Sequence, residues 1–415
     1  METGAGFPQT RKTWPTLRGK PASNGKALIR MKSTGMKLTA LSAGAIVASL
    51  LFVKGAHGQA PAGDKPPLAE QAFKNVQVLK GITADEFLGT MGAFSAALGW
   101  SCEDCHKADD TKWENFGIDN PAKVRTRQMI QMMQGINKTY FGGRQAVTCF
   151  SCHHGANHPK TTPNLATLYY NRDAPFEVSD DILQPAPNQP SADQILDRFI
   201  QAMGGAQKLA AVTSIVAKGT NSGYGPESGK RQAEIYAKSP AQRTLIVHTD
   251  NGDQTTVFDG RNAWYSAPLR PIPVLSYSGA ELAGMKLEAE MEFPGRIKQF
   301  LTNLKVAFPQ PIGDKDYQVV QGTTAEGTLA TLFFDPDTGL LTRMVRYTNS
   351  VVGRFPTMID YADYRDVNGV KIPFRMSNSW LDGREQYELT DVQVNTPIEA
   401  AKFAKPAPAT TPKAR

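Results

Sequence analysis

Two short segments, Cys102 to His106 and Cys149 to His153, contain all four cysteines of this 415-residue chain. Each has the spacing Cys-x-x-Cys-His, which is typical of covalent attachment of a c-type haem. In that chemistry two thiols form thioethers to the porphyrin vinyl groups, and the adjacent histidine places a ring nitrogen on the iron. The sequence therefore predicts two haem c groups whose iron is held by the motif histidines, and the side chains that attach and ligate them are Cys102, Cys105, His106, Cys149, Cys152 and His153.

Paired cysteines have two other uses, a tetrahedral zinc site built from four thiolates and a pair of structural disulfides. Neither use requires a histidine directly after each pair, as His106 and His153 are placed here. Haem attachment is therefore the preferred interpretation. His154 and His158 also lie near the second motif. Either histidine could bind an iron on the side opposite the motif histidine, which would give a lower haem potential than a methionine in that position. A surface or supporting position is expected for both.

Each motif follows a segment with the pattern of a methionine-bearing helix. Thr83 to Glu86 reads as a capping box, and the helix that it opens should end before Gly99, with an apolar stripe that includes Met91. Asn120 before Pro121 predicts the start of a second helix, which should reach Tyr140 and carries Met129, Met132 and Met133. The order helix, turn and haem motif thus occurs twice, as an internal repeat of roughly 45 residues.

These segments resemble the first half of the cytochrome c subunit of photosynthetic reaction centres. The resemblance covers about residues 70–160 and rests on four stretches: Asn75–Leu79, Glu86–Met91, Val124–Met129 and Val147–His153. It implies that the helix methionine of each unit is the sixth iron ligand, so that Met91 pairs with His106 and Met129 pairs with His153. Met132 and Met133 are the rivals of Met129 for the second iron.

Two departures from that family affect the expected role. Family members that feed a reaction centre carry four haems, whereas this chain has no cysteine after Cys152 and can attach only two. A histidine that the family supplies between the second methionine and the second motif is also missing, since residues 140–144 contain none. A general electron shuttle between redox proteins is therefore expected rather than a donor to photo-oxidised chlorophyll.

The first 58 residues read as an export leader. Lys32 and Lys37 precede an apolar run from Leu38 to Val53, and small residues follow up to a suggested cleavage after Gly58. An uncleaved leader that anchors the chain to the inner membrane is the alternative, and Met31 and Met36 are alternative start sites of translation. The overall charge of +7 includes +8 from this leader and leaves −1 for the rest, so no nucleic-acid partner is expected. Export and haem attachment together predict a periplasmic protein.

The pattern changes after residue 172. Residues 173–191 are rich in proline and predict a linker, and Ser191 opens another capped helix. Short alternating segments then predict an antiparallel meander, which a bent helical stretch from Gly279 to Leu304 interrupts. The predicted strands are Ser214–Gly219, Gln232–Lys238, Gln242–Thr249, Gln254–Phe258, Ala263–Ser266, Tyr317–Gly322, Thr328–Asp335, Leu341–Thr348, Thr357–Arg365, Val370–Trp380 and Glu385–Asn395.

Three turn-bearing stretches of this region, Phe258–Trp264, Phe334–Gly339 and Tyr364–Pro373, resemble the half-barrel of outer-membrane lipoprotein carriers. In those relatives the concave face holds acyl chains, which makes a lipid-like or quinone-like apolar ligand one expectation for this region. A scaffold or docking domain is the other. No ligand-binding residue is carried over from the resemblance.

The expected fold class is α+β multidomain, with a helical dihaem c-type cytochrome domain followed by a curved antiparallel sheet with helices. The predicted boundaries are a leader at 1–58, a cytochrome domain at 59–172, a linker at 173–191, a half-barrel at 192–400 and a disordered tail at 401–415. Two functions compete, an electron carrier and a sensor in which the sheet binds an apolar ligand. An enzyme is not expected, because no nucleophile, base or metal constellation follows residue 160; peroxidase-type activity is a minor possibility.

Overall fold

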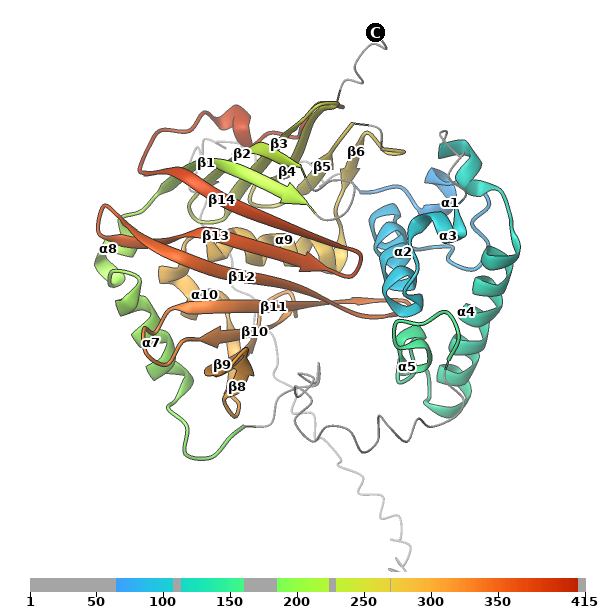
Figure 1. Ribbon diagram of the computed structural model, residues 1–415, viewed down its shortest axis with the longest axis horizontal. Helices are drawn as coiled ribbons and strands as arrows, with labels where there is room; N and C mark the ends of the chain where they lie inside the picture. The colour runs from blue at the N-terminus through green and yellow to red at the C-terminus, as the bar shows by residue number, and fades with distance from the viewer. Residues whose placement is uncertain (1–64, 107–112, 160–184, 224–228, 269, 410–415) are drawn as a thin grey trace, which may run out of the picture. The chain divides into compact units, whose positions relative to one another are not determined.

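The computed structural model describes residues 65–106, 113–159, 185–223, 229–268 and 270–409 (Figure 1). These residues belong to one compact unit. The predicted leader and most of the predicted linker lie outside the described residues. No helix in the part of the chain that the structure describes is long and apolar enough to cross a membrane.

The N-terminal part of the described chain is helical (Figure 1). Its two long helices are the predicted methionine-bearing helices, and each is followed by a short helix that contains a Cys-x-x-Cys motif. The elements are α1 (Ala69–Ala72), α2 (Ala84–Leu98), α3 (Cys102–Cys105), the 3-10 turn η1 (Trp113–Gly117), α4 (Pro121–Tyr140) and α5 (Cys149–His153). The predicted cap of α4 is confirmed, because the Asn120 side chain accepts a hydrogen bond from the Lys123 amide at 3.0 Å.

The predicted capping box of α2 is wrong. Thr83 stands at the N-cap position, but its side chain makes no capping hydrogen bond to the helix. Its hydroxyl instead accepts a hydrogen bond from Ser278. Burial raises the pKa of Glu86, and the backbone of Val351, in the sheet region, opposes that shift. For Thr83, a partner from the distant sheet region has replaced the local one.

The C-terminal part is built on a 14-stranded antiparallel sheet with the order β6-β5-β4-β3-β2-β1-β14-β13-β12-β11-β10-β9-β7, and β8 pairs with β9. The first and last strands pair in its middle, with Ile215 opposite Val394. The strands are β1 (Ser214–Gly223), β2 (Lys230–Lys238), β3 (Gln242–Thr249), β4 (Gly252–Phe258), β5 (Ala263–Ser266), β6 (Val274–Ser276), β7 (Thr302–Val306), β8 (Gln310–Ile312), β9 (Lys315–Thr323), β10 (Leu329–Phe334), β11 (Leu341–Ser350), β12 (Gly353–Val367), β13 (Val370–Trp380) and β14 (Gly383–Val394).

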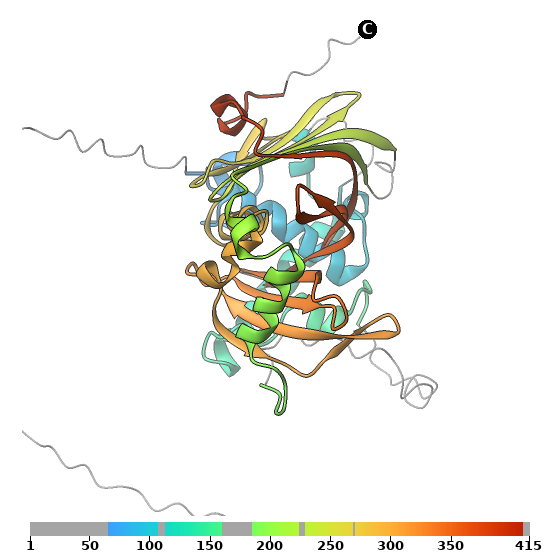
Figure 2. The ribbon, with the colours of Figure 1, turned by 90° about the vertical axis from the view of Figure 1, so that its left-hand side faces the viewer.

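Helices pack against this sheet, and the sheet curves around one of them (Figure 2). Helix α9 (Gly279–Met291) contacts β3 and β4 as well as β11, although β3 and β11 are far apart in the strand order. The other elements are α7 (Ala192–Ala202), α8 (Ala206–Ala210), η3 (Pro294–Arg296), α10 (Ile297–Phe300) and η4 (Ala400–Phe403). The main core joins the helices to the sheet through buried residues such as Leu196, Phe199, Leu287, Leu332 and Met344. The predicted open antiparallel sheet with helices is thus confirmed.

Two local expectations for this region differ from the structure. The helical stretch that was predicted to reach Leu304 ends at Phe300, because Lys305 and Val306 pair with β9 and form the edge strand β7. The first residues of the predicted disordered tail pack against the sheet. Phe403 is buried, and the hydroxyl of Ser266 donates a hydrogen bond to the carbonyl oxygen of Ala407.

Candidate haem sites

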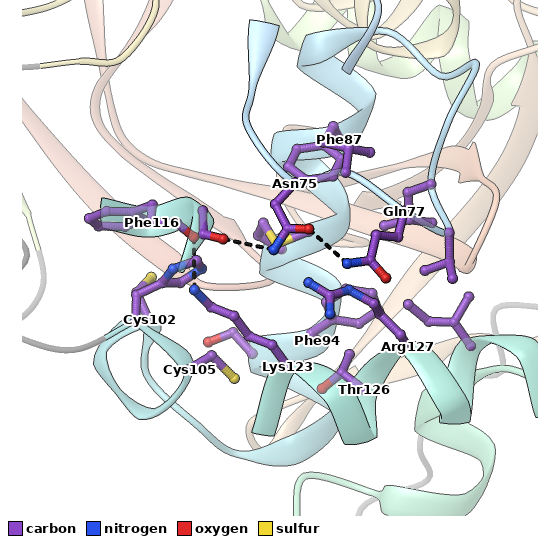
Figure 3. Close-up of a pocket in the computed structure, with 18 of the residues that line it drawn as sticks. Asn75, Gln77, Phe87, Phe94, Cys102, Cys105, Phe116, Lys123, Thr126 and Arg127 are labelled. Atoms are coloured by element: carbon purple, nitrogen blue, oxygen red, sulfur yellow. Dashed lines mark hydrogen bonds between the residues drawn. The ribbon is translucent and has the colours of Figure 1, made fainter. Parts of the chain in front are cut away.

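The first Cys-x-x-Cys-His motif and the methionine of α2 line a single cavity. Met91, Cys102, Cys105 and His106 all contribute to its wall. Figure 3 shows the two cysteines in this wall. Helix α2 supplies Met91, helix α3 supplies both cysteines, and His106 directly follows α3. The structure therefore brings together the four residues that the sequence assigned to the first haem.

The local sequence explains how this motif is presented. Gly99 ends α2 in the left-handed conformation, with φ of 64°. The Asp104 carboxylate then accepts hydrogen bonds from the Ser101 amide at 2.7 Å and from its hydroxyl at 3.1 Å, which stabilises the single turn of α3. The Asn120 side chain donates to the carbonyl oxygen of Cys105 at 2.6 Å. Because Asn120 also caps α4, one side chain joins the first motif to the second methionine helix.

The rest of the cavity wall is mostly apolar, with cationic side chains from α4 and the preceding chain. Apolar and aromatic contributions come from Val76, Val78, Leu79, Phe87, Phe94, Leu98, Trp100, Phe116 and Ile130. The rings of His106 and Phe116 stack with their centroids 4.5 Å apart. Lys74, Lys123 and Arg127 also line the cavity, and Figure 3 shows Phe116 and Arg127 on opposite sides of it. An apolar slot with cations suits a porphyrin ring that carries two propionates.

Two of these cations are themselves positioned by hydrogen bonds. The Lys123 ammonium group donates to the carbonyl oxygens of Phe116 and Ile118, both at 2.7 Å. Arg127 forms an ion pair with Asp119, and the guanidinium lowers the pKa of that exposed carboxyl group. The α4 face that carries Lys123, Thr126, Arg127 and Ile130 is therefore turned toward the first site.

The second motif is presented by α5 and held by α4. Thr148 and Ser151 form a capping box at the start of α5. Upstream, the buried Asn137 side chain donates to the carbonyl oxygen of Val147 at 2.7 Å and accepts from the amides of Ala146 and Val147. Sequence reasoning did not identify Asn137, because its partners lie nine and ten residues away and no local pattern indicates them.

His153 has the hydrogen bond expected of an iron ligand. Its Nδ1 lies 2.9 Å from the carbonyl oxygen of Ala156. When Nδ1–H donates to a carbonyl group, Nε2 is the unprotonated nitrogen that can bind a metal, and the ring orientation is fixed. His154 follows in the left-handed conformation with its ring against Phe150, so its geometry differs from that of His153.

The three methionines of α4 have different surroundings. Met133 is 4% exposed and belongs to an apolar cluster with Leu79, Ala93 and Ile130. Met132 is 48% exposed, and Met129 is half-buried. Tyr140 and Phe150 are also large exposed apolar side chains in this part of the chain. Met129 and Met132 are three residues apart and are therefore neighbours on the surface of α4. Neither lines the first cavity.

The two repeat units touch through their backbones. The Gly155 amide, after the second motif, donates to the carbonyl oxygen of Ala97 at 2.9 Å. A Cβ atom on Gly99 would lie 2.2 Å from the carbonyl oxygen of Gly155. Only glycine permits this approach, which fixes the segment before the first motif against the segment after the second.

The alternative uses of the cysteines do not fit this arrangement. All four cysteines are free thiols, and no group of three or more His, Cys, Asp or Glu side chains within the described ranges is placed to hold a metal ion. The geometry therefore fits two separate attachment sites better than one four-cysteine site.

Comparison with known families agrees with this arrangement. Residues 32–191, which include both motifs and both methionine helices, match the family described as photosynthetic reaction centre cytochrome c subunit. The resemblance predicted from the sequence is confirmed for this part of the chain.

Individual relatives cover the same part only. The photosynthetic reaction center cytochrome c subunit of Roseobacter denitrificans is 38% identical over 100 residues, which are 22% of this chain and 26% of the relative. Cytochrome c-554 of Chloroflexus aurantiacus is 28% identical over 116 residues, which are 26% of each chain. The chain thus spans about a quarter of the length of the curated relatives that it matches.

Solved structures similar to the sheet region are more distant. A LolA superfamily protein of Nitrosomonas europaea has a TM-score of 0.37 and 14% identity, over 52% of this chain and 99% of that one. A putative outer membrane lipoprotein-sorting protein domain of Vibrio parahaemolyticus has a TM-score of 0.36 and 11% identity, over 51% of this chain and 97% of that one.

Proposed function

We propose that this protein is an exported c-type cytochrome that carries two covalently attached haems and passes electrons between redox proteins. The observation that carries the proposal is the single cavity lined by Met91, Cys102, Cys105 and His106. A thioether-forming pair, a proximal histidine and a distal thioether converge there from two helices. The match of residues 32–191 to a cytochrome c family supports the same conclusion.

In the first site each side chain has a separate task. Cys102 and Cys105 form the thioether links, His106 supplies a ring nitrogen and Met91 a thioether sulfur to the iron. A bound haem supplies the one-electron Fe(III)/Fe(II) couple. Phe94, Trp100 and the other apolar side chains of the wall exclude water, while Lys123 and Arg127 balance the propionates.

The second site uses Cys149, Cys152 and His153, with Met129 as the sixth ligand. The hydrogen bond from His153 to the carbonyl oxygen of Ala156 supports its role as a ligand. Met133 is the less suitable rival because it is packed in the apolar cluster with Ile130. Met132 remains the alternative, since it lies on the exposed side of α4 next to Met129.

This ligation favours electron transfer over catalysis. An iron that was held by both a histidine and a methionine would have no free position for peroxide or oxygen. A methionine ligand also favours Fe(II) and raises the potential relative to two histidines. A carrier of moderately positive potential is therefore proposed, rather than a peroxidase.

The interior of the sheet region favours a structural role over an apolar-ligand sensor. Glu288 of α9 and Glu292, which directly follows α9, line a cavity between the helices and the sheet, and they pair with Arg346 and Arg243 at 2.8 Å each. Arg346 and Glu288 are both buried. An apolar chain placed against these ion pairs would displace any water that solvates them and could not replace its hydrogen bonds. The sensor thus remains the second candidate, without an observation that favours it.

The proposal also includes a cellular location and a set of domain boundaries. Haem attachment and the leader at residues 1–58 suggest the periplasm, where redox protein partners would exchange electrons with the helical domain. If the leader is retained, the protein would be attached to the inner membrane. The proposed domains are a cytochrome domain at 59–172 and a sheet domain at 192–400, joined by residues 173–191.

A redox titration of the purified holoprotein, followed by optical spectroscopy, tests the proposal. We expect two one-electron transitions, low-spin spectra in both oxidation states and no binding of carbon monoxide to the reduced protein. Rapid exchange with small cytochromes and potentials that do not respond to added lipid or quinone would favour the carrier over the sensor. Substantial high-spin haem in the native protein would contradict the proposed ligation and favour a peroxidase.

A further inference from the structure

The hairpin between β11 and β12 has one buried residue at its tip, Val352, beside the exposed Val351. β11 ends at Ser350 and β12 begins at Gly353, so Val351 and Val352 form the turn. Turns of this kind normally face solvent. Val352 is nevertheless only 2% exposed, and the Ser350 hydroxyl fixes its position by accepting a hydrogen bond from the Val352 amide at 3.2 Å.

The apolar cluster around Val352 belongs to the helical region rather than to the sheet. Its buried members are Leu79, Ala93, Ile130, Met133 and Val352, and Met91 packs against them as a partly buried residue. Phe355, and Leu381 from the turn between β13 and β14, pack against the same cluster. The cluster thus joins both methionine-bearing helices, α2 and α4, to two hairpins of the sheet.

Polar contacts surround this apolar contact at the start of α2. The buried Asp85 carboxylate accepts a hydrogen bond from the Ser278 amide at 2.7 Å and another from its hydroxyl at 3.0 Å. Burial also raises the pKa of Glu86, and the nearby backbone of Val351 opposes that shift.

Further contacts reach α2 again and the start of α5. A Cβ atom on Gly92, beside Met91, would lie 3.0 Å from the Asp382 carboxylate. A Cβ atom on Gly353 would lie 3.4 Å from Thr148, which caps α5. The hairpin tips therefore contact α2 and α4, which carry the proposed methionine ligands, and approach Thr148 at the start of α5.

We propose that the tip of the β11–β12 hairpin holds the two methionine-bearing helices in position, with Val352 as the positioning residue. The inference rests on the proposed function and extends it. The sheet domain packs against the haem domain, and the binding of methionine to iron depends on this packing. A thioether is a weak ligand delivered by a helix, so a small displacement of α2 or α4 lengthens or breaks its bond to iron. The partner of this helical surface is thus the chain's own sheet.

The test compares Val352→Ala with Val370→Ala in the full-length holoprotein. Val370 begins β13 and is 3% exposed, but it packs in the main core under α7 and α9. Both substitutions remove the same atoms from equally buried sites. We expect imidazole to displace methionine from the oxidised iron on the order of tenfold faster in Val352→Ala. A tenfold change in rate corresponds to about 1.4 kcal/mol of activation free energy. Val370→Ala should match the wild-type rate. Val352→Ile, which keeps a branched apolar side chain at this position, should match it as well.

Amide hydrogen exchange on the same proteins tests whether Val352 positions the helices, independently of iron ligation. The amides of α2 and α4 should exchange faster in Val352→Ala than in Val370→Ala. Equal exchange in these helices, or equal displacement rates in both variants, would overturn the proposal. If no methionine is bound in the wild-type protein, the proposed ligation fails, while the exchange comparison still decides whether Val352 positions the helices.

Discussion

Replacing Met91 by alanine should leave both haems covalently attached but open one coordination position. The four cysteines are untouched, so the haem content should not change. Loss of the thioether ligand removes the preference for Fe(II), and we expect the potential of one haem to fall by about 0.1 V, within the range of about 0.8 V that axial ligands command. Carbon monoxide should then bind one haem per chain, as measured by the difference between spectra of the reduced protein with and without carbon monoxide.

Met132→Ala is the control for this experiment. Met132 has the same side chain but lies half-exposed on α4, outside the first cavity. If Met129 is the second ligand, this variant should keep both potentials and bind no carbon monoxide, whereas Met129→Ala should open the second iron. A Met91→Ala protein that stays fully low-spin with unchanged potentials would exclude Met91 as a ligand.

The substitution Gly99→Ala should cause a large loss of stability. Gly99 adopts φ of 64°, and its new Cβ would lie 2.2 Å from the carbonyl oxygen of Gly155. The left-handed conformation costs about 1–2 kcal/mol for alanine, and the overlap adds roughly 1–3 kcal/mol. We therefore expect chemical denaturation of the holoprotein to show a free energy of unfolding lower by about 2–5 kcal/mol.

Gly142→Ala separates the two causes. Gly142 has nearly the same φ of 62°, but nothing lies within 4 Å of the Cβ position. Its substitution should cost only the conformational part, about 1–2 kcal/mol. Equal losses in the two variants would show that the contact between Gly99 and Gly155 adds nothing to stability, and that the two repeat units are not fixed by it.

Features set by neighbouring residues could be predicted from the sequence. The two haem motifs, the cap at Asn120 and the limits of α4 follow from local patterns, because each depends on side chains within one or two turns. The same holds for strands bounded by turn residues, such as Gln242–Thr249 and Val370–Trp380, whose predicted limits agree with the structure. Met91 needed the family resemblance, since methionine at helical spacing usually fills a core.

Features set by distant residues could not be predicted. Thr83 and Glu86 have the sequence of a capping box, yet Thr83 makes no capping bond and accepts a hydrogen bond from Ser278 of the sheet region instead. Val352 reads as an ordinary turn residue, and only the tertiary structure places it among Leu79, Ile130 and Met133. The pairing of β1 with β14 is likewise nonlocal, because an alternating pattern predicts strands but not which strands at opposite ends of a meander will meet.

Counting the haems tests the two-haem carrier most directly. The full chain should be matured in a periplasm and analysed by intact mass together with a pyridine haemochrome assay. We predict a mass increased by two haem groups, two haems per chain in the assay, and no cysteine available to thiol reagents. A protein with fewer than two bound haems, or with Cys102, Cys105, Cys149 or Cys152 still reactive, would contradict the proposed function.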